Sequence, residues 1–330
     1  MRVLVTGATG FIGSSVARVL LGAGCEVRAL VRAGADTRAI ADLPVAQCTG
    51  DLRDAESVRA AVCGCRQVYH VGALYTYWTR RPDEIYATNV NGTRNVLAAA
   101  QAEGVERVVY TSSVATLGSR SDGAPADEET HATLADMVSD YKRSKFLAEQ
   151  VALDFAKQGL PVVIVNPSTP VGVRDIKPTP TGRIVLDFIS GRMPAYVDTS
   201  LNIVDVEDVA VGHWLAAQKG QVGRRYILGN RNMTMREILE TLARISGRPA
   251  PRLRLPFWAA MAFAHADTAL ARLTPSHVPR ATPDTVRLAR KPMRFDASRA
   301  VRELGLPQSD PYEALEKAVD WFQHSARNRS

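Results

Sequence analysis

The stretch that decides the fold is Arg2-Val3-Leu4-Val5-Thr6-Gly7-Ala8-Thr9-Gly10-Phe11-Ile12-Gly13. A short apolar run leads into a glycine-rich turn, and a helical pattern begins directly behind it. Gly7, Gly10 and Gly13 allow a tight turn and let the backbone approach a diphosphate without a clash at Cβ. The N–H groups at the start of the helix then attract the anion. The stretch therefore predicts a dinucleotide site, although its G-x-x-G-x-x-G spacing is one residue longer than the common fingerprint.

Apolar runs and helical patterns alternate over the first two-thirds of the chain. Each run is continuously apolar, which is typical of strands in a parallel sheet that is covered on both faces. The alternation predicts an α/β fold with a doubly wound parallel sheet of the Rossmann type. The strand candidates are Val3–Val5, Val27–Val31, Val68–Val71, Val108–Tyr110 and Val162–Val165, and helical patterns lie near 11–22, 54–62, 83–103 and 140–158.

The pattern changes after Pro167. Four prolines between positions 167 and 180 indicate a loop or a lid. Thr234 and Glu237 have the spacing of a capping box and open a helix, and further helical patterns lie near 256–273 and 311–324. Strand signals become rare in this part, so we expect it to be mostly helical.

These patterns predict two domains. Residues 1–166 form the Rossmann domain, and residues 167–330 form a smaller, mostly helical lobe on the substrate side. We expect the chain to return into the Rossmann domain around 200–230.

The charge of the chain is moderate and scattered. The 330 residues carry a formal net charge of +7, from 41 basic and 34 acidic residues, without a run of five or six like charges. This distribution favours a solvated surface over a nucleic-acid-binding face. It is compatible with a basic pocket for an anionic cofactor or substrate.

The cysteines complete no metal-site spacing, so we expect no metal and a reducing, cytoplasmic environment. They are Cys25, Cys48, Cys63 and Cys65. The sequence opens on a strand and shows no signal-peptide pattern.

The longest mostly apolar stretch is Leu255–Leu273, which His265, Asp267 and Arg272 interrupt. These polar residues argue against an integral membrane segment. We expect an amphipathic helix that packs on its own domain, and contact with a membrane surface is the lesser alternative.

The end of the second predicted strand bears on the choice of cofactor. An NAD site usually has an acidic residue there that binds the ribose 2′-hydroxyl, but none occurs before Asp36. Arg32 instead offers a guanidinium suited to a 2′-phosphate. We therefore expect NADP(H) to be preferred, with NAD(H) possible; the alternative is that Arg32 is only a surface residue.

Two further segments are expected along the dinucleotide. Asp51 and Leu52 follow a strand and are placed to contact the adenine. Val71, Gly72 and Ala73 supply small side chains where the cofactor would pass. Each segment could also be only a turn.

A reacting centre is indicated by Ser113, Tyr141 and Lys145. Tyr141 and Lys145 are four residues apart on a predicted helix and therefore share a face. A nearby ammonium and an oxidised nicotinamide lower the pKa of the phenol, which can then exchange a proton with a substrate. Ser113 follows a predicted strand and can hydrogen-bond the same substrate oxygen. A Y-x-x-x-K spacing by itself is common, and its combination with the glycine turn and Ser113 makes it specific.

Together these motifs resemble the extended short-chain dehydrogenase/reductase family, over essentially the whole chain. The resemblance implies cofactor contacts from the glycine turn, including Thr9, Phe11 and Ile12, and from Pro167 and Ser168 beside the nicotinamide. It also implies Ser113, Tyr141 and Lys145 as the catalytic set and Asn89, within Asn89–Thr93, as a structural or proton-relay residue. Asp205–Ala210 resembles a marker of the family's C-terminal part.

Two branches of the family are similar to this sequence in particular stretches. Dihydroflavonol 4-reductase-like enzymes, which prefer NADPH, share the pattern Val27–Arg32. The hopanoid-associated sugar epimerase group is similar at greater length, in Tyr110–Gly118, Tyr141–Glu149, Asn166–Pro170 and Asp175–Arg183. The length of the last stretch favours the epimerase group, whose name implies a sugar substrate.

Four positions depart from patterns in the family. Gly72 stands where alanine is usual, and Leu117 replaces a tyrosine common in nucleotide-sugar epimerases, which puts one hydroxyl at the sugar site in doubt. Val114 and Ala115 replace the acidic pair of sugar dehydratases, so dehydration is not expected.

The substrate pocket is expected to combine aromatic faces, for a sugar or flavonoid ring, with cations for an anionic group. Aromatic residues also fill cores and charges also solvate loops, so each assignment has a structural alternative. The candidates are Tyr75, Trp78, Ser113, Lys177, Arg183, Met193 and Tyr196.

Several functions remain open from the sequence. An epimerase would oxidise and re-reduce a sugar on a retained cofactor, whereas a reductase would consume NADPH and reduce a ketone or aldehyde. A non-catalytic NADP-binding sensor, or a scaffold at a membrane, would use the same fold. Family analogy adds a possible homodimer through the helices near 83–103 and 140–158.

Overall fold

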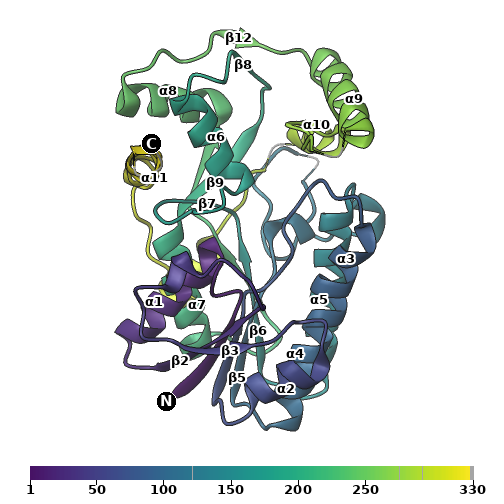
Figure 1. Ribbon diagram of the computed structural model, residues 1–330, viewed down its shortest axis with the longest axis vertical. Helices are drawn as coiled ribbons and strands as arrows, with labels where there is room; N and C mark the ends of the chain where they lie inside the picture. The colour runs from purple at the N-terminus through teal and green to yellow at the C-terminus, as the bar shows by residue number, and fades with distance from the viewer. Residues whose placement is uncertain (121, 275, 292, 328–330) are drawn as a thin grey trace.

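A seven-stranded sheet forms the centre of the computed structural model, which describes residues 1–120, 122–274, 276–291 and 293–327 (Figure 1). The strand order is β10-β6-β5-β4-β1-β2-β3, and every pair in the sheet is parallel. This order confirms the predicted doubly wound Rossmann architecture. The strands are β1 (Arg2–Thr6), β2 (Glu26–Val31), β3 (Ala46–Thr49), β4 (Gln67–His70), β5 (Arg107–Thr111), β6 (Val162–Pro167) and β10 (Arg225–Leu228).

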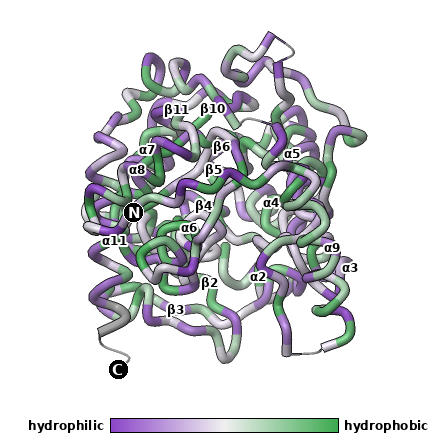
Figure 2. Tube along the Cα trace, turned by 90° about the horizontal axis from the view of Figure 1, so that it is seen from above, coloured by the Kyte–Doolittle hydropathy of each residue, from purple (hydrophilic) through white to green (hydrophobic). Residues whose placement is uncertain are grey.

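Helices cover both faces of this sheet, which explains the continuous apolar runs. In β1, Val3 and Val5 belong to the core on one face, whereas Leu4 belongs to the core on the other. Figure 2 shows α7 on one side of the central strands and α2, α4 and α5 on the other. The first face is covered by α1 (Phe11–Gly22) and α7 (Val206–Lys219), and the second by α2 (Ala55–Val62), α4 (Gly92–Ala102) and α5 (Asp140–Lys157).

The substrate lobe combines helices with two small sheets that its sequence did not indicate. The strands β7, β9 and β11 form one sheet, and β8 and β12 form a two-stranded pair. Five helices surround them in the described part of the lobe (Figure 1). The elements are β7 (Thr169–Val171), β8 (Ala195–Tyr196), β9 (Ser200–Asp205), β11 (Arg231–Thr234), β12 (Leu253–Arg254), α6 (Pro180–Ile189), α8 (Met235–Ser246), α9 (Phe257–Leu273), α10 (Pro283–Ala289) and α11 (Pro311–Arg327).

The two parts of the chain exchange segments. After β9, α7 packs on the central sheet and β10 extends that sheet beside β6. The chain then leaves again for β11. The boundary at 166/167 thus stays a prediction from the order of the sequence. In space, residues 206–228 lie with the Rossmann domain.

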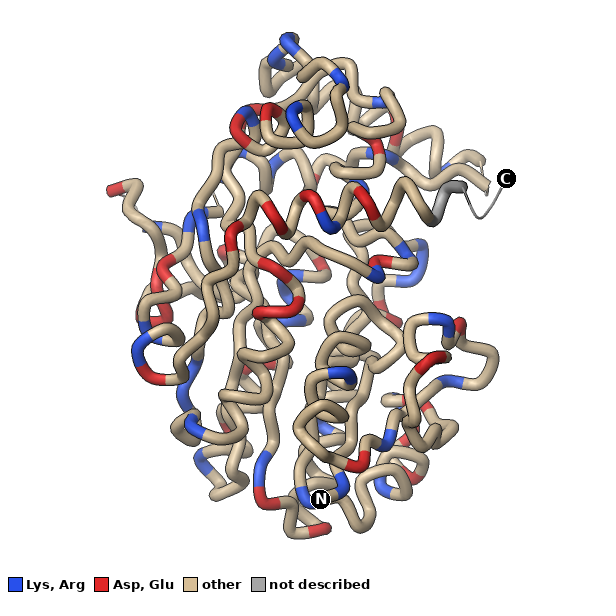
Figure 3. The backbone as a smooth tube through the Cα atoms, turned by 90° about the vertical axis from the view of Figure 1, so that its left-hand side faces the viewer, with Lys and Arg blue, Asp and Glu red and all other residues tan. Residues whose placement is uncertain are grey.

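Charges of both signs are interspersed over the backbone trace (Figure 3). Many basic residues stand beside an acidic partner, as Arg18 does with Asp42 at 2.7 Å. Within the described ranges, no helix has the length and apolar character needed to cross a membrane.

An ion pair between a buried carboxylate and a partly exposed ammonium joins α11 to the junction between β9 and α7. Asp205 is 1% exposed, and its Oδ1 accepts a hydrogen bond from the N–H of Glu207 at 2.8 Å, which caps α7. Its Oδ2 accepts from Lys317 Nζ at 2.9 Å, and the same ammonium reaches Glu207 at 2.9 Å. These hydrogen bonds raise the pKa of Lys317. The marker Asp205–Ala210 thus lies where the substrate lobe is fixed to the Rossmann domain.

Replacing Lys317 by Met should lower the free energy of unfolding by about 2 kcal/mol, because a buried carboxylate loses its partner while the apolar stem is kept. Urea unfolding followed by circular dichroism measures the loss. Adding Asp205→Asn to Lys317→Met should recover part of it. An unchanged unfolding midpoint in Lys317→Met would show that the pair does not stabilise the protein.

Candidate active site

A cavity of about 730 Å³ lies at the carboxyl edge of the central sheet, between the Rossmann domain and the substrate lobe. Such an edge is where open α/β sheets bind ligands. All sixteen residues that the sequence assigned to the cofactor line this cavity. They are Gly7, Thr9, Gly10, Phe11, Ile12, Gly13, Arg32, Asp51, Leu52, Val71, Gly72, Ala73, Tyr141, Lys145, Pro167 and Ser168.

The glycine turn has the shape that a dinucleotide diphosphate requires. A Cβ on Gly13 would lie 2.0 Å from the carbonyl oxygen of Gly7, and one on Gly7, at φ +70°, would lie 2.6 Å from Gly72 Cα. The helix α1 begins after Gly10, which offers no side chain to cap it. The N–H groups of its first turn therefore remain open to an anion. The residues present thus fit a bound dinucleotide.

The far end of this part of the cavity is basic. Arg53 holds Asp51 through two hydrogen bonds of 3.0 and 2.7 Å, and Arg32 lines the cavity beside them. The first acidic residue after β2, Asp36, is held in the same way by Arg38. In the described part of the chain the Arg32 guanidinium has no ion-pair partner.

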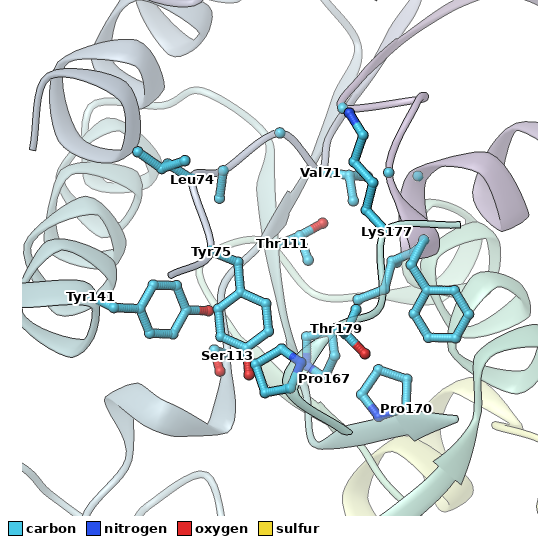
Figure 4. A pocket seen from close by; sticks show the side chains of 18 of the residues that line it. Val71, Leu74, Tyr75, Thr111, Ser113, Tyr141, Pro167, Pro170, Lys177 and Thr179 are labelled. Atoms are coloured by element: carbon cyan, nitrogen blue, oxygen red, sulfur yellow. The ribbon is translucent and has the colours of Figure 1, made fainter. Parts of the chain in front are cut away.

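Tyr141 and Ser113 face one another in the cavity, and Tyr75 lies beside them (Figure 4). The ring of Tyr141 is 4.7 Å from that of Tyr75 and 5.5 Å from that of Tyr77, measured between centroids. Ser139 caps α5 by accepting from the N–H of Lys142, which fixes the helix start that carries Tyr141. The arrangement places two hydroxyl groups where one substrate oxygen can contact both.

The pKa of Tyr141 lies above its ordinary value, whereas the sequence led us to expect a lowered one. Burial raises the pKa of this phenol, the nearby Tyr77 raises it further, and only its hydrogen bond with Ser113 lowers it. The ammonium of Lys145, expected to lower it, donates instead to the carbonyl of Thr111 at 2.7 Å. In the protein alone, Tyr141 is therefore a protonated phenol at neutral pH.

Lys145 is held by a buried polar network. Its Nζ also donates to the hydroxyl of Tyr110 at 3.3 Å, and burial lowers the pKa of Lys145 to about 8. Beside Tyr110, His70 hydrogen-bonds Thr93 at 3.0 Å and Thr6 at 2.7 Å. Burial lowers the pKa of His70 to about 3, so its ring is neutral. The network fixes the ammonium next to the cavity floor, and the buried Glu149 partly offsets the effect of burial on the pKa of Lys145.

Asn89 is a positioning residue in this structure. It is 1% exposed and lies in a π-helical turn, Ala87–Asn91, between α3 (Pro82–Tyr86) and α4. Its amide accepts from the N–H of Leu74 at 2.7 Å and donates to the carbonyl of Leu74 and to Ser144 Oγ at 3.1 and 2.9 Å. It thereby ties the loop that carries Tyr75 to the helix that carries Tyr141, and it does not line the cavity.

Three of the seven substrate candidates, Tyr75, Ser113 and Lys177, line the cavity. Lys177 extends toward the glycine turn (Figure 4), and its charge acts on Asp36, so it lies on the cofactor side. The other four, Trp78, Arg183, Met193 and Tyr196, are not among the lining residues. Met193 and Tyr196 pack instead in the core of the substrate lobe.

The part of the cavity wall that comes from Pro178 onward is uncharged, although Arg174 and Asp175, just before it, also line the cavity. Twelve lining residues come from Pro178 onward, and none is Asp, Glu, Lys or Arg. The sequence did not point to them because eight are apolar and resemble any core residue, and the other four are threonines outside the catalytic and cofactor motifs. They are Pro178, Thr179, Pro180, Thr181, Ile184, Thr199, Leu201, Met235, Thr285, Leu288, Ala289 and Met293.

Asp175 is a buried carboxyl on the cavity wall that the sequence analysis did not single out as a site residue. It is 2% exposed and accepts from the N–H and hydroxyl of Thr179 at 2.9 and 2.8 Å. Burial outweighs these bonds and raises the pKa of Asp175 to about 6. The preceding Arg174 has φ 68°, an uncommon value for a residue with a side chain.

Asp175 should make stability fall as the pH rises through 6. The pKa of Asp175 is higher in the folded state than in the unfolded state. The contribution of its protonated carboxyl to the free energy of unfolding is therefore complete below pH 4 and is lost above pH 6. Between pH 5 and 7.5 the protein should lose about 1 kcal/mol relative to Asp175→Asn. Urea unfolding at both pH values checks this, and parallel pH dependences would contradict it.

Comparison with known proteins agrees with this site. Residues 3–229 match the NAD dependent epimerase/dehydratase family. A Synechocystis protein named "Putative dihydroflavonol 4-reductase" is 48% identical over 97% of this chain and 94% of its own. "Sterol demethylase protein B" of Methylococcus capsulatus is 37% identical over 98% of both chains. The crystal structure of gox2253 is 44% identical, covers 98% of both chains and has a TM-score of 0.88. The chain therefore belongs to the NAD-dependent epimerase/dehydratase family of enzymes, which confirms the resemblance seen in the sequence and the nicotinamide dinucleotide that it implied.

Proposed function

We propose that this protein is an NADP(H)-dependent reductase of neutral, mainly apolar ketones or aldehydes. The observation that carries the proposal is the division of the cavity. Arg32, Arg53 and Lys177 line its cofactor side, and the described wall from Pro178 onward has no charged side chain, with Asp175 as the carboxyl that precedes this wall. A sugar nucleotide would place its own diphosphate at the substrate end, where it needs cations. An uncharged carbonyl compound needs none.

The basic end of the cavity supports NADP(H). Arg32 and Arg53 lie together at the adenosine end, and Asp36, the nearest acid after β2, is already bound by Arg38. An acid held in that way is a poor acceptor for a ribose 2′-hydroxyl. The free guanidinium of Arg32 suits a 2′-phosphate, which it can bind through two N–H groups.

The chain's own residues supply a proton and an oriented substrate. The nicotinamide, when bound, supplies the hydride. Tyr141 donates its phenolic proton to the substrate oxygen, and Ser113 hydrogen-bonds the same oxygen. Lys145, fixed by Thr111 and Tyr110, stabilises the phenolate that remains. Asn89 keeps the Tyr75 loop and α5 in register.

A sugar epimerase related to the hopanoid-associated group is the second candidate. The stretch Asp175–Arg183 favours it by resemblance. However, Lys177 lies on the cofactor side and Arg183 does not line the cavity, so neither meets a sugar diphosphate at the substrate end. A non-catalytic NADP sensor is less consistent with the site, because Ser113, Tyr141 and Lys145 are all present and gathered in one cavity.

Arg32→Ala should weaken NADPH binding by about 10- to 100-fold, because a charge-assisted bond to the 2′-phosphate is lost, and should leave NADH binding nearly unchanged. Fluorescence titration of both cofactors measures the two dissociation constants. Arg120→Ala, at a residue that does not line the cavity, is the control. An equal loss for both cofactors, or tighter NADH binding in the unaltered protein, would argue against NADP(H).

With an apolar ketone or aldehyde, the absorbance of added NADPH should fall steadily, because each turnover consumes one molecule. Tyr141→Phe should bind NADPH normally and turn over about 10²- to 10⁴-fold more slowly, since the proton donor is missing. Tyr312→Phe serves as the matched control. Constant NADPH absorbance while a sugar changes its stereochemistry would favour the epimerase, and full activity of Tyr141→Phe would remove Tyr141 from the reaction.

A further inference from the structure

The outer face of α9 is apolar and exposed. Trp258 is 73% exposed, Phe263 53% and Leu273 83%, and Leu270 is exposed beside them. Figure 1 shows α9 at the edge of the substrate lobe, with α10 on its inner side. Single exposed apolar residues are normal, but several on one helix form a contiguous patch of the kind that marks an interaction site.

The distribution of polar and apolar residues around α9 is the reverse of that in an ordinary surface helix. At 100° per residue, its buried arc holds Asp267 and Thr268 among alanines, and its exposed arc holds Trp258, Phe263 and Leu273. Only His265 and Arg272 among the exposed residues of this helix are polar, and both lie at one margin of the arc. A helix in water usually shows its polar face to the solvent, so this face is built to be covered.

The segment around the patch is strongly basic. Residues 251–294 contain eight Lys or Arg and two Asp or Glu, a formal net charge of +6 where the whole chain has +7. Neither acid is free. Asp267 is buried and hydrogen-bonds His277 at 2.6 Å, and Asp284 pairs with Arg287 at 3.0 Å. Outside the segment, Asp198 pairs with Arg254 at 2.7 Å, and the other six basic residues have no ion-pair partner in the part of the chain that the structure describes.

We propose that α9 docks the protein on an anionic lipid surface, an interaction that goes beyond the reductase activity. Exposed Trp, Phe and Leu insert at the level of the headgroups, and the arginines around them attract acidic lipids. A second copy of the chain is a poor occupant of the same face, because two faces with this charge repel one another. The charge complementarity therefore favours a membrane over a dimer.

Docking at this place would bring the lipid close to the substrate end of the cavity. The buried face of α9 packs through Ala260 and Ala264 against Val286 of α10. The same α10 lines the cavity with Leu288 and Ala289. Helix α10 therefore lies between the proposed lipid contact and the uncharged wall of the cavity. This arrangement is a suitable route for an apolar compound.

The test is co-sedimentation of the full chain with vesicles of phosphatidylglycerol or of phosphatidylcholine, without substrate or cofactor. We expect binding to phosphatidylglycerol vesicles, weaker binding at high salt, and little binding to phosphatidylcholine. Trp258→Glu with Leu273→Glu should lower the binding at least tenfold. Both side chains are exposed, so the fold tolerates the change. Val222→Glu, at an exposed valine outside the patch, is the matched control and should bind like the unaltered protein.

Recovery of the unaltered protein in the supernatant with phosphatidylglycerol vesicles would overturn the proposal. Equal binding by the double Glu variant would also overturn it, since the contact would then lie elsewhere. Size-exclusion chromatography tests whether a second copy of the chain covers this face instead. A dimer of the unaltered protein that dissociates in the double Glu variant would assign the face to that second copy. None of these outcomes depends on NADPH consumption, so failure of the reductase assay is a separate result.

Discussion

The close approach of β1, α1 and the segment after β4 is the constraint on which the site depends. Gly7 contacts Gly72 and Gly13 contacts Gly7 at distances that leave no room for a Cβ. Because these backbones touch, the first turn of α1 opens directly onto the carboxyl edge of the sheet. The same edge receives the ends of β5 and β6, and so Ser113 and Pro167 come to the cavity that the glycine turn begins.

Electrostatics then divides this cavity. On the cofactor side, arginines bind the acids that might have met a ribose hydroxyl, as Arg38 does with Asp36, and Arg32 remains available. On the substrate side, the described wall is uncharged from Pro178 onward. Lys145 lies between the two halves, and neutral groups hold it: the carbonyl of Thr111, the hydroxyl of Tyr110 and, behind them, the unprotonated ring of His70. These neutral groups hold the ammonium by hydrogen bonds, while the buried Glu149 acts on it only through its charge, so the ammonium remains available to a neighbouring phenolate.

The parts that the sequence could predict are those in which residue type determines geometry. A glycine that must avoid a Cβ contact, or a strand buried on both faces, has a distinctive pattern, so the central sheet and the cofactor side of the cavity were predictable. The substrate wall was not, because Leu288 or Met293 looks like any core residue, and Tyr196 turned out to be one. The strands β8 and β12 have two residues each, too few for a periodicity. The raised pKa of Tyr141 results from burial, which cannot be predicted from the spacing of Tyr141 and Lys145 in the sequence.

The protonation state of Tyr141 also bears on the direction of the reaction. Burial keeps its phenol protonated, because the charged form would lie in a site that excludes water. Reduction of a carbonyl requires a proton donor at the substrate oxygen as negative charge develops there, and a protonated phenol is that donor. Oxidation of an alcohol requires the phenolate first, and the nearby Tyr77 makes its formation harder. An epimerase must begin with the oxidation, whereas a reductase begins from the state that burial favours. In the protein without its cofactor, burial therefore holds Tyr141 in the form that the proposed reduction requires.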